Sequence, residues 1–357
     1  MKVLVTGAGG LIGSEASRFF LEMGAEVEGI DNNMRKYFFG NKGDISGNIS
    51  FLADNHEKFR NAVIDIRDRN KIIQYFGENG PFDIIIHTAA QPSHDWAARE
   101  PFTDWDVNAN GTLNILEAFR QYSPKATFIF TSTNKVYGDN PNKVALIETP
   151  TRYDYSQQQV MLGVCSEGIN EHMSLDDCKH SIFGASKTAA DIIAQEYGKY
   201  FGLNVGVFRG GCLTGPQHAA VELHGFLSYI IECAITSTSY KIFGYKGKQV
   251  RDQIHSSDVV SAFWQFHQNP KQGEVYNIGG GKQNAASILE IIDILNRDFG
   301  LNLKYSYVDQ HRIGDHICYY TDLSKFKRDF PSWKITKNLH DIIREIIDKK
   351  RKNMTSK

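Results

Sequence analysis

The sequence has no excess of charge of either sign and no apolar run long enough to cross a membrane. A membrane-spanning helix needs roughly 18 or more consecutive apolar residues, and no window of the chain approaches that, so no membrane partner is expected. The 40 basic and 41 acidic residues nearly cancel, which leaves no electrostatic footprint for nucleic acid or an anionic membrane. The 357 residues suffice for one large domain or two interleaved domains with a substantial core.

Cysteine is scarce, and no two cysteines form a Cys-x-x-Cys pair. The five positions are Cys165, Cys178, Cys212, Cys233 and Cys318. An odd number of scattered cysteines argues against a disulfide framework and against a metal site. Reduced thiols in a cytoplasmic protein are therefore expected, and no bound metal. The chain enters an apolar strand directly after Met1, which argues against a secretory leader.

The first residues are typical of a dinucleotide-binding turn. The apolar run Val3 to Val5 predicts a buried strand, and three glycines follow it at Gly7, Gly10 and Gly13. The first glycine allows the sharp turn, the second lets the backbone approach a pyrophosphate, and the third lets the next helix pack closely on the strand. The N-terminus of that helix, which contains Leu11 and Ile12, is expected to hold the phosphates.

A second apolar stretch, Ala25 to Ile30, ends in Asp31. A carboxylate there accepts both ribose hydroxyls of adenosine and repels a 2′-phosphate, so NAD is expected rather than NADP. Arg35 and Lys36 keep NADP open as an alternative, although charges in a loop are usually solvated. The order of strand, glycines, helix, strand and acid is much more specific than a glycine cluster alone. The competing interpretation is a doubly wound domain without a cofactor.

Short apolar strands alternate with helical periods over residues 1–210. This pattern predicts an α/β fold with a Rossmann-type doubly wound parallel sheet. We expect strands at 2–6, 26–30, 61–65, 83–88, 126–131 and 204–208, and helices at 11–23, 68–77, 103–121 and 182–201. Polar insertions occupy 32–58 and 149–180, and the second is long enough to form a lid over a ligand.

The pattern changes after residue 210, which predicts a smaller C-terminal α/β domain over 211–357, partly interleaved with the first. Helices are expected near 222–236, 256–268, 286–298 and 337–350. Ligands bind outside the carboxyl ends of the strands in open parallel sheets. The smaller domain is therefore expected to carry the substrate and close a cleft above the cofactor.

Polar or small residues follow the remaining strands of the predicted sheet. The motifs are Asp65-Ile66, His87-Thr-Ala-Ala-Gln91, Val107-Asn108-Ala-Asn-Gly-Thr112, Thr131-Ser-Thr-Asn-Lys-Val-Tyr-Gly138 and Phe183-Gly-Ala-Ser-Lys187. Asp65 is suited to receive the adenine amino group. The small side chains of Ala89 and Ala90 let a cofactor pass close to the backbone.

In combination these motifs resemble the extended short-chain dehydrogenase/reductase family, which contains the nucleotide-sugar epimerases and dehydratases. The resemblance runs from Met1 to about Asp322. Three segments are more narrowly similar to the CDP-paratose 2-epimerase branch, and they are Gln91-Pro-Ser-His-Asp-Trp96, Ser132-Thr-Asn-Lys-Val-Tyr-Gly-Asp139 and Thr151-Arg-Tyr153. The resemblance implies an NAD-dependent epimerase that inverts C2 of a deoxyhexose carried on CDP. A 4-epimerase, dehydratase or dehydrogenase of the same fold is the alternative.

The resemblance also implies roles for individual residues. In the family, the tyrosine of Tyr-x-x-x-Lys takes the sugar hydroxyl proton, the lysine lowers the pKa of that tyrosine, and a strand-end hydroxyl binds the reacting oxygen. Lys187 matches the lysine, and Ser132 and Thr133 match the hydroxyls. The residues expected at the cofactor are Gly7, Gly10, Leu11, Ile12, Gly13, Asp31, Asn32, Asp65, Ile66, Ala89, Ala90, Gln91, Asn108, Thr131 and Lys187.

The chain departs from the family at the catalytic tyrosine, because position 183 is Phe. A general base is typically worth about 10²–10⁴-fold in rate. Three explanations stay open: an engineered substitution, a different base, or a protein that binds NAD and a nucleotide sugar without this chemistry. The candidates for a replacement base are His94, Tyr137, Cys178 and His180. The alternative is that these side chains only pack or line a lid.

The second domain is expected to bind the nucleotide sugar. The resemblance places Gln249 and Arg251 at the nucleotide diphosphate, Arg312 as a further phosphate ligand, and His94 at the substrate. A guanidinium offers two donors to such oxygens. Arg209 is either a substrate ligand or a structural ion-pair residue. The family also implies a homodimer built from the helices at 103–121 and 182–201.

Overall fold

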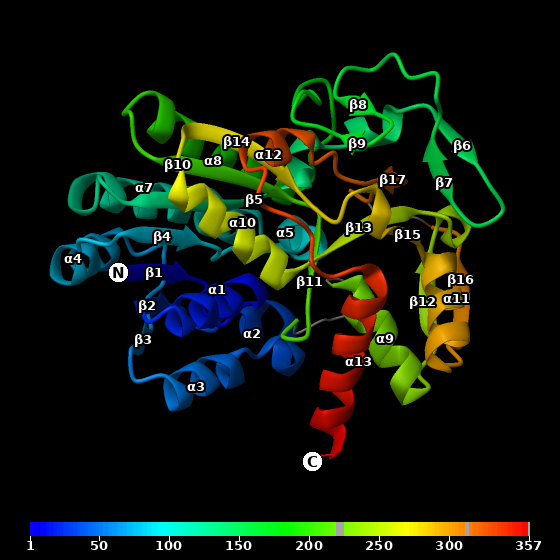
Figure 1. The fold of residues 1–357 in the computed structure, drawn as a ribbon, viewed down its shortest axis with the longest axis horizontal. Helices are drawn as coiled ribbons and strands as arrows, with labels where there is room; N and C mark the ends of the chain where they lie inside the picture. The colour runs from blue at the N-terminus through cyan, green and yellow to red at the C-terminus, as the bar shows by residue number, and fades with distance from the viewer. Residues whose placement is uncertain (219–224, 311–313, 356–357) are drawn as a thin grey trace. The chain divides into compact units, whose positions relative to one another are not determined.

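The computed structural model describes residues 1–218, 225–310 and 314–355 (Figure 1). The chain divides into two compact units, and each is built from separate stretches of sequence. The first consists of Met1–Val136, Ile182–Gly210 and Val259–Tyr276. The second consists of Tyr137–Ser181, Gly211–Asp258 and Asn277–Lys357. No helix in the described ranges is both long and apolar enough to cross a membrane.

The first unit contains a seven-stranded sheet in the order β14-β10-β5-β4-β1-β2-β3. The strands are β1 (Lys2–Thr6), β2 (Glu26–Ile30), β3 (Phe59–Ala62), β4 (Ile84–His87), β5 (Thr127–Thr133), β10 (Val205–Gly210) and β14 (Gln272–Ile278). Neighbours from β10 to β3 pair in parallel. The order reverses between β1 and β4, which is the switch point where doubly wound sheets bind ligands. The predicted Rossmann-type fold is confirmed.

Helices cover both faces of this sheet. On one face, α4 (Arg69–Asn79), α7 (Gly111–Tyr122) and α8 (Ser181–Lys199) form a core cluster with apolar strand residues that include Phe128 and Phe130. These two residues face the same helices because side chains alternate along a strand. On the other face, α1 (Leu11–Glu22) packs on β1 and β2, and Phe208 contacts Phe263 of α10 (Ser256–Gln268) with ring centroids 5.0 Å apart.

Four details of the first unit differ from expectation. The third strand ends at Ala62 rather than at residue 65, and the expected helix at 103–121 is divided into α6 (Pro101–Trp105), a π-helical turn (Asp106–Asn110) and α7. The insertion at 32–58 contains α2 (Met34–Phe39), a 3-10 turn (Gly40–Gly43) and α3 (Ser46–Asn55). The seventh strand, β14, was not expected. Its pairing with β10 joins segments distant in sequence, so local pattern carries no sign of it.

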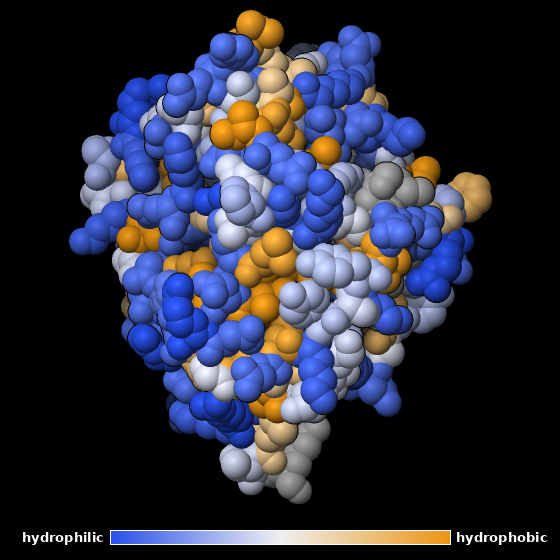
Figure 2. Space-filling model, turned by 90° about the vertical axis from the view of Figure 1, so that its right-hand side faces the viewer, coloured by the Kyte–Doolittle hydropathy of each residue, from blue (hydrophilic) through white to orange (hydrophobic). Residues whose placement is uncertain are grey.

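The second unit has a four-stranded sheet of β11 (Cys212–Thr214), β13 (Val250–His255), β15 (Ala285–Ser287) and β17 (Cys318–Tyr319). A separate pair joins β12 (Tyr240–Phe243) to β16 (Tyr305–Val308). Its apolar core lies among α9 (Phe226–Thr236), α11 (Ile288–Phe299) and α13 (Leu339–Thr355). A further short helix of this unit is α12 (Ser324–Asp329). The face shown in Figure 2 is mostly hydrophilic, with hydrophobic side chains gathered near its centre.

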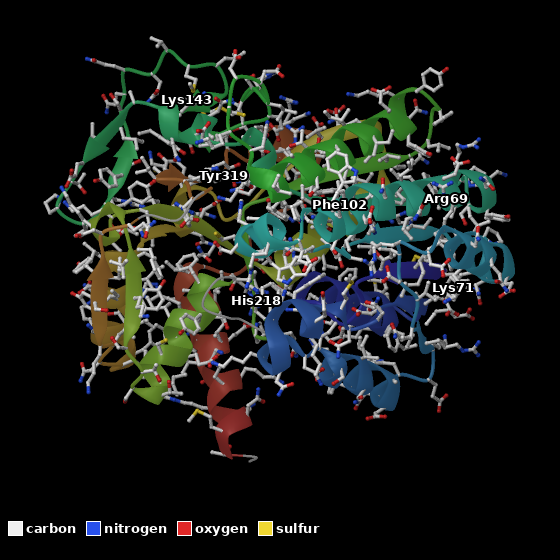
Figure 3. All side chains as sticks on the ribbon, turned by 180° about the vertical axis from the view of Figure 1, so that it is seen from behind. Arg69, Lys71, Phe102, Lys143, His218 and Tyr319 are labelled. Atoms are coloured by element: carbon white, nitrogen blue, oxygen red, sulfur yellow. The ribbon has the colours of Figure 1, made fainter. Side chains whose placement is uncertain are left out.

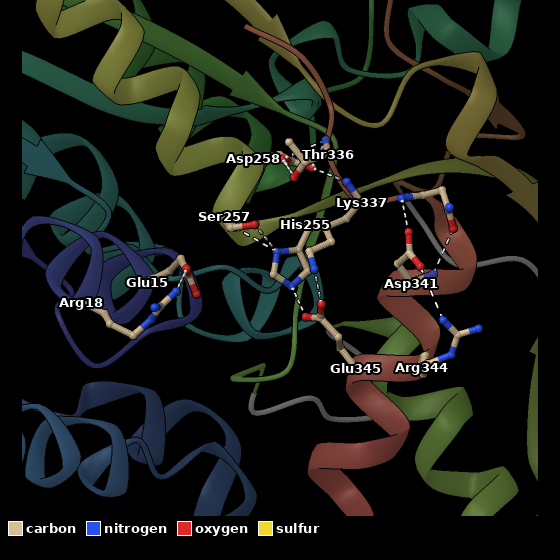
Figure 4. A network of polar contacts seen from close by, with 11 residues as sticks. Glu15, Arg18, His255, Ser257, Asp258, Thr336, Lys337, Asp341, Arg344 and Glu345 are labelled. Atoms are coloured by element: carbon tan, nitrogen blue, oxygen red, sulfur yellow. Dashed lines mark hydrogen bonds and ion pairs between the residues drawn. The ribbon is translucent and has the colours of Figure 1, made fainter. Parts of the chain in front are cut away.

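Polar contacts fix the start of α13 within the second unit (Figure 4). The Asp258 carboxylate accepts hydrogen bonds from the Thr336 N–H at 3.1 Å and the Thr336 hydroxyl at 2.6 Å. Glu345 on α13 lies 3.1 Å from His255 Nε2 and 2.6 Å from Lys337 Nζ. Asp258, in the first turn of α10, therefore has a structural role in holding the segment before α13.

The segment 149–180 belongs to the second unit and is folded onto it. It contains β7 (Tyr153–Tyr155), which pairs with β6 (Leu146–Glu148), and the hairpin of β8 (Val164–Cys165) and β9 (Gly168–Ile169). Glu171 Oε1 accepts a hydrogen bond from the Asn277 N–H at 2.6 Å. Arg152 Nη2 donates to the Ala285 carbonyl oxygen at 2.9 Å. These contacts hold the insertion against its own unit, and a lid role stays a prediction.

Candidate functional site

The glycine turn after β1 has the geometry expected of a phosphate site. Gly7 has a φ of +71°, which side chains rarely adopt. A Cβ on Gly13 would lie 2.0 Å from the Gly7 carbonyl oxygen, so only glycine lets α1 approach this closely. Gly10 is the N-cap of α1 and has no side chain to cap it. The first-turn N–H groups, beginning at Leu11 and Ile12, therefore suit the oxygens of a pyrophosphate.

Asp31 stands at the end of β2 and is bound to the glycine turn. Its Oδ2 accepts the Gly9 N–H at 2.9 Å, and its Oδ1 accepts the Asn33 N–H at 2.8 Å. Burial raises the pKa of this carboxyl. Each carboxylate oxygen has a second lone pair, so both can still accept a ribose hydroxyl.

The two basic residues that left NADP open both have partners here. Lys36 forms an ion pair with Asp44 at 2.8 Å. The Arg35 guanidinium lies 4.8 Å from the centroid of the Phe39 ring. Both basic residues therefore have a local contact besides any ligand, and the Asp31 carboxylate, which would repel a 2′-phosphate, is what favours NAD.

A hollow of about 590 Å³ lies beside these residues in the first unit. It is lined by Asn32, Asn33, Met34, Lys36, Tyr37, Asp65, Arg67 and Thr103. Two predicted cofactor residues, Asn32 and Asp65, are among them. The Asp65 carboxylate is held by Arg67 at 2.7 Å, and Ile66 is buried against Gly111. Tyr37, Arg67 and Thr103 were missed, because nothing in their local sequence distinguishes them from surface residues.

A buried polar network joins the loop after β4 to the helices above it. Asp104 is 0 % exposed, and its carboxylate accepts hydrogen bonds from Gln91 Nε2 at 2.6 Å, Asn108 Nδ2 at 3.1 Å and Ser186 Oγ at 2.6 Å. Burial raises the pKa of Asp104. Gln91 and Asn108 were predicted at the cofactor, whereas Asp104 and Ser186 were not. Through Ser186, the residue before Lys187, the network holds α8 in place. Through Gln91 it holds the loop that contains the half-buried Ala89 and Ala90.

Lys187 is buried, and its Nζ donates to the Thr131 carbonyl oxygen at 3.0 Å. Burial lowers its pKa to about 8. The Thr131 hydroxyl is buried without a hydrogen-bond partner in the protein. A buried, unpartnered hydroxyl is costly unless a ligand or water satisfies it. The orphaned oxygen beside Lys187 fits a polar group of a bound cofactor, as the predicted nicotinamide ribose site requires.

The two strand-end hydroxyls point to different surroundings. Ser132 Oγ donates to Asp191 Oδ2 at 2.5 Å, in the same buried cluster where Arg209 Nη2 meets Asp191 Oδ1 at 2.7 Å. Of the two roles considered for Arg209, substrate ligand or structural ion pair, the structure shows the ion pair. Thr133 is the last residue of β5, half-buried, and its hydroxyl accepts only a Lys135 N–H among the bonds observed. Of the two, Thr133 is better placed for a substrate oxygen.

The four candidate bases have different surroundings. His94, the first residue of α5 (His94–Arg99), makes an edge-on contact with Phe183, with ring centroids 4.8 Å apart. Tyr137 is 0 % exposed, and its hydroxyl donates to Asn277 Oδ1 at 2.7 Å. His180 Nε2 lies 2.8 Å from the Leu175 carbonyl oxygen and 3.3 Å from Cys178 Sγ. Tyr137, Cys178 and His180 belong to the second unit, and each forms a hydrogen bond within it.

The second unit holds the predicted nucleotide-sugar residues in and beside β13. Arg251 is half-buried and donates to the Val250 carbonyl oxygen at 2.7 Å. Gln249 Nε2 donates to the Phe243 carbonyl oxygen at 3.2 Å, and its buried Oε1 has no partner. The preceding loop is strained, because Tyr245 and Lys246 have φ values of +53° and +56°. Such strain gathers at binding sites. Arg312 lies outside the described residues.

Comparisons with known proteins agree with this geometry. The profile of the family described as "NAD dependent epimerase/dehydratase family" matches residues 3–176 and 161–279. The chain is 32% identical over 334 residues to CDP-paratose 2-epimerase of Salmonella typhi, covering 91% of this chain and 92% of the relative. It is 28% identical over 364 residues to dTDP-glucose 4,6-dehydratase of Shigella flexneri, covering 98% and 92%.

Among solved structures, UDP-glucuronic acid 4-epimerase from Bacillus cereus, in complex with UDP-glucuronic acid and NAD, superposes with a TM-score of 0.77. The match covers 99% of this chain and 100% of the other chain at 23% identity. At that identity it shows that the two chains share a fold.

Proposed function

The chain belongs to the NAD dependent epimerase/dehydratase family, and from this premise we propose that it epimerises C2 of a CDP-linked deoxyhexose. The family assignment establishes NAD as the cofactor and an enzyme of the nucleotide-sugar class. The finer proposal, CDP and C2, has its main support in the 32% identity to a CDP-paratose 2-epimerase over 91% of the chain. A 4-epimerase or dehydratase remains the alternative.

The arrangement of buried groups in the first unit supports redox chemistry on a sugar carbon. The glycine turn and α1 would hold the pyrophosphate, Asp31 the adenosine ribose, and Lys187 the nicotinamide ribose. Bound NAD supplies a two-electron acceptor for the hydrogen on the reacting carbon. Thr133 would donate a hydrogen bond to the reacting oxygen, and the positive charge of Lys187 would stabilise negative charge developing there.

Proton NMR of CDP-paratose incubated with the protein and NAD tests this proposal directly. We expect the signals of the C2 epimer, CDP-tyvelose, to grow until both isomers are present at equilibrium. Lys187→Met should abolish turnover, whereas Lys199→Met, an exposed lysine on the same helix, should leave it unchanged. An unchanged spectrum would contradict the CDP-sugar proposal, and UDP- and dTDP-linked sugars would then be tested in the same way.

Phe183 favours a second candidate, a protein that binds NAD and a nucleotide sugar without turnover. Calorimetry separates the two, because this candidate predicts measurable affinity for both ligands but no isomer, dehydrated product or reduced cofactor.

We propose that the chain forms a homodimer in which α6, α7 and α8 make the interface with a second copy. These helices expose large apolar side chains, which mark protein–protein interfaces where they form one patch. Phe102 is 88% exposed (Figure 3), and Tyr200 at the end of α8 is 79% exposed. Light scattering after chromatography should give a dimer for the wild type and a monomer for Phe102→Glu combined with Tyr200→Glu. An exposed aromatic residue of the second unit, Tyr307→Glu, is the control.

A further inference from the structure

His94 and Phe183 meet although 89 positions separate them (183 − 94). Phe183 lies in the first turn of α8 and is 7% exposed. The His94 ring meets it at an interplanar angle of 66°. Phe183 stands where the family has the tyrosine of Tyr-x-x-x-Lys, one helical turn before Lys187. The imidazole is therefore a titratable side chain in ring contact with the position where a phenol is missing.

The backbone that carries His94 is held rigidly. The preceding residue, Ser93, donates its N–H to Gln91 Oε1 at 2.6 Å and accepts Gln91 Nε2 on its carbonyl oxygen at 2.9 Å. Gln91 is itself buried and bound to Asp104. Two residues after His94, Trp96 packs on Phe38 with ring centroids 4.6 Å apart. An acid–base group needs such positioning, because proton transfer requires a fixed donor–acceptor distance.

Other titratable groups of the first unit have hydrogen-bonding or cofactor roles. His87 is buried, and its ring nitrogens lie 2.6 Å from the Thr6 hydroxyl and 2.9 Å from the Thr112 hydroxyl. Burial lowers the pKa of His87 to about 3, so it stays neutral and bonded. The Asp104 carboxylate accepts three hydrogen bonds, and Lys187 is needed at the cofactor. Asp95 follows His94 on α5 and is the nearest acidic side chain along the chain.

We propose that His94 is the acid–base residue that replaces the missing phenol in this chain. The inference rests on the proposed function. The neutral imidazole would take the proton of the reacting sugar hydroxyl and become imidazolium, and bound NAD would supply the acceptor for the hydrogen and electron pair lost by the carbon. In the reverse half of the cycle, the imidazolium would return its proton to the same oxygen as the hydrogen and its electron pair return to the opposite face of the carbon. Protons, charge and electrons are therefore conserved over one epimerisation.

The proposal predicts a specific kinetic pattern for His94→Gln, which keeps a polar side chain but does not titrate. We expect kcat to fall by about 10²–10⁴-fold, with KM and NAD affinity within about threefold of the wild type. His172→Gln, an exposed histidine, is the matched control and should retain full activity. The double variant His94→Gln with Phe183→Tyr should have a kcat at least tenfold higher than that of His94→Gln alone. The pH at which its rate rises should also differ from that of the wild type, because a phenol rather than an imidazole then takes the proton.

A second measurement needs no turnover. In protein labelled at histidine and phenylalanine, the His94 ring signal is assigned by its through-space contact with the Phe183 ring, whose centroid lies 4.8 Å away, and its pH titration is followed by NMR with NAD present. Adding CDP-glucose should shift the titration midpoint of His94 by at least half a pH unit and leave that of His172 unchanged. A His94 titration that is insensitive to the nucleotide sugar would overturn the proposal, even if His94→Gln did not fold.

The outcomes separate the two proposals. Wild-type turnover that His94→Gln retains within a few-fold overturns the role of His94 and leaves the proposed function standing. No turnover of any nucleotide sugar by the wild type overturns both. A loss in His94→Gln that Phe183→Tyr does not relieve indicates a positional effect and also overturns the acid–base role.

Discussion

The buried cluster of Arg209, Asp191 and Ser132 yields the sharpest test of how this site is built. Replacing Arg209 with Met removes the cation and leaves the Asp191 carboxylate, 0 % exposed, without its charge partner. The guanidinium makes two bonds to that carboxylate, at 2.7 and 3.0 Å. Removing one partner of such a buried pair typically costs about 3–5 kcal/mol, because the remaining charge is uncompensated.

That free energy corresponds to a measurable change in melting temperature. With an unfolding entropy of about 2.1 cal/mol/K per residue, cooperative melting of all 357 residues implies a loss of about 4–7 °C. The double variant Arg209→Met with Asp191→Leu removes both charges. It should recover most of the loss, because apolar replacements of a buried pair are often nearly neutral. The Ser132 hydroxyl, left unpaired, would retain a penalty of about 1 kcal/mol.

Thermal melts followed by circular dichroism measure this, with NAD omitted because a ligand stabilises the folded state by mass action. The competing interpretation, in which Arg209 binds substrate, predicts a different result. An Arg209→Met protein that melts within about 1 °C of the wild type but binds the nucleotide sugar more weakly would refute the structural role.

Three further predictions follow from other contacts. Gly13→Ala should lower the free energy of unfolding by about 1–3 kcal/mol or more and abolish NAD binding, since its Cβ would lie 2.0 Å from the Gly7 carbonyl oxygen. The control is Gly47→Ala, whose Cβ would have no atom within 4 Å. Thermal melts and NAD titrations of both variants measure the two effects. Burial lowers the pKa of Lys187 from 10.5 to about 8, so the folded chain binds fewer protons than the unfolded chain between these values. Stability should therefore rise by about 3 kcal/mol from pH 8 to pH 10.5, and denaturant titrations of Lys187→Met should lack this rise. Asp31→Ser should shift the ratio of NADP to NAD affinity upward by at least tenfold in fluorescence titrations, and an unchanged ratio would contradict the role of Asp31.

The glycine turn, the acid after β2 and the alternation of strands and helices could all be predicted from local sequence. Gly7, Gly13 and Asp31 act through the backbone conformation and chemistry of their own segments, so their spacing along the chain carries the signal. Asp104 and Ser186 could not be found this way. A carboxylate on a short helix is typical of a solvated surface, and the burial of Asp104 depends on contacts with Gln91 of the loop after β4 and Ser186 of α8.

The sequence by itself determined the fold class, the cofactor and the absence of a tyrosine at position 183, because each depends on residue identity and local period. The tertiary structure decided which face each strand-end side chain meets. It turned Ser132 toward the Asp191–Arg209 pair, left Thr133 at the strand end, and brought His94 against Phe183. These outcomes depend on β-strand alternation and on packing between segments far apart in sequence, which no local pattern contains.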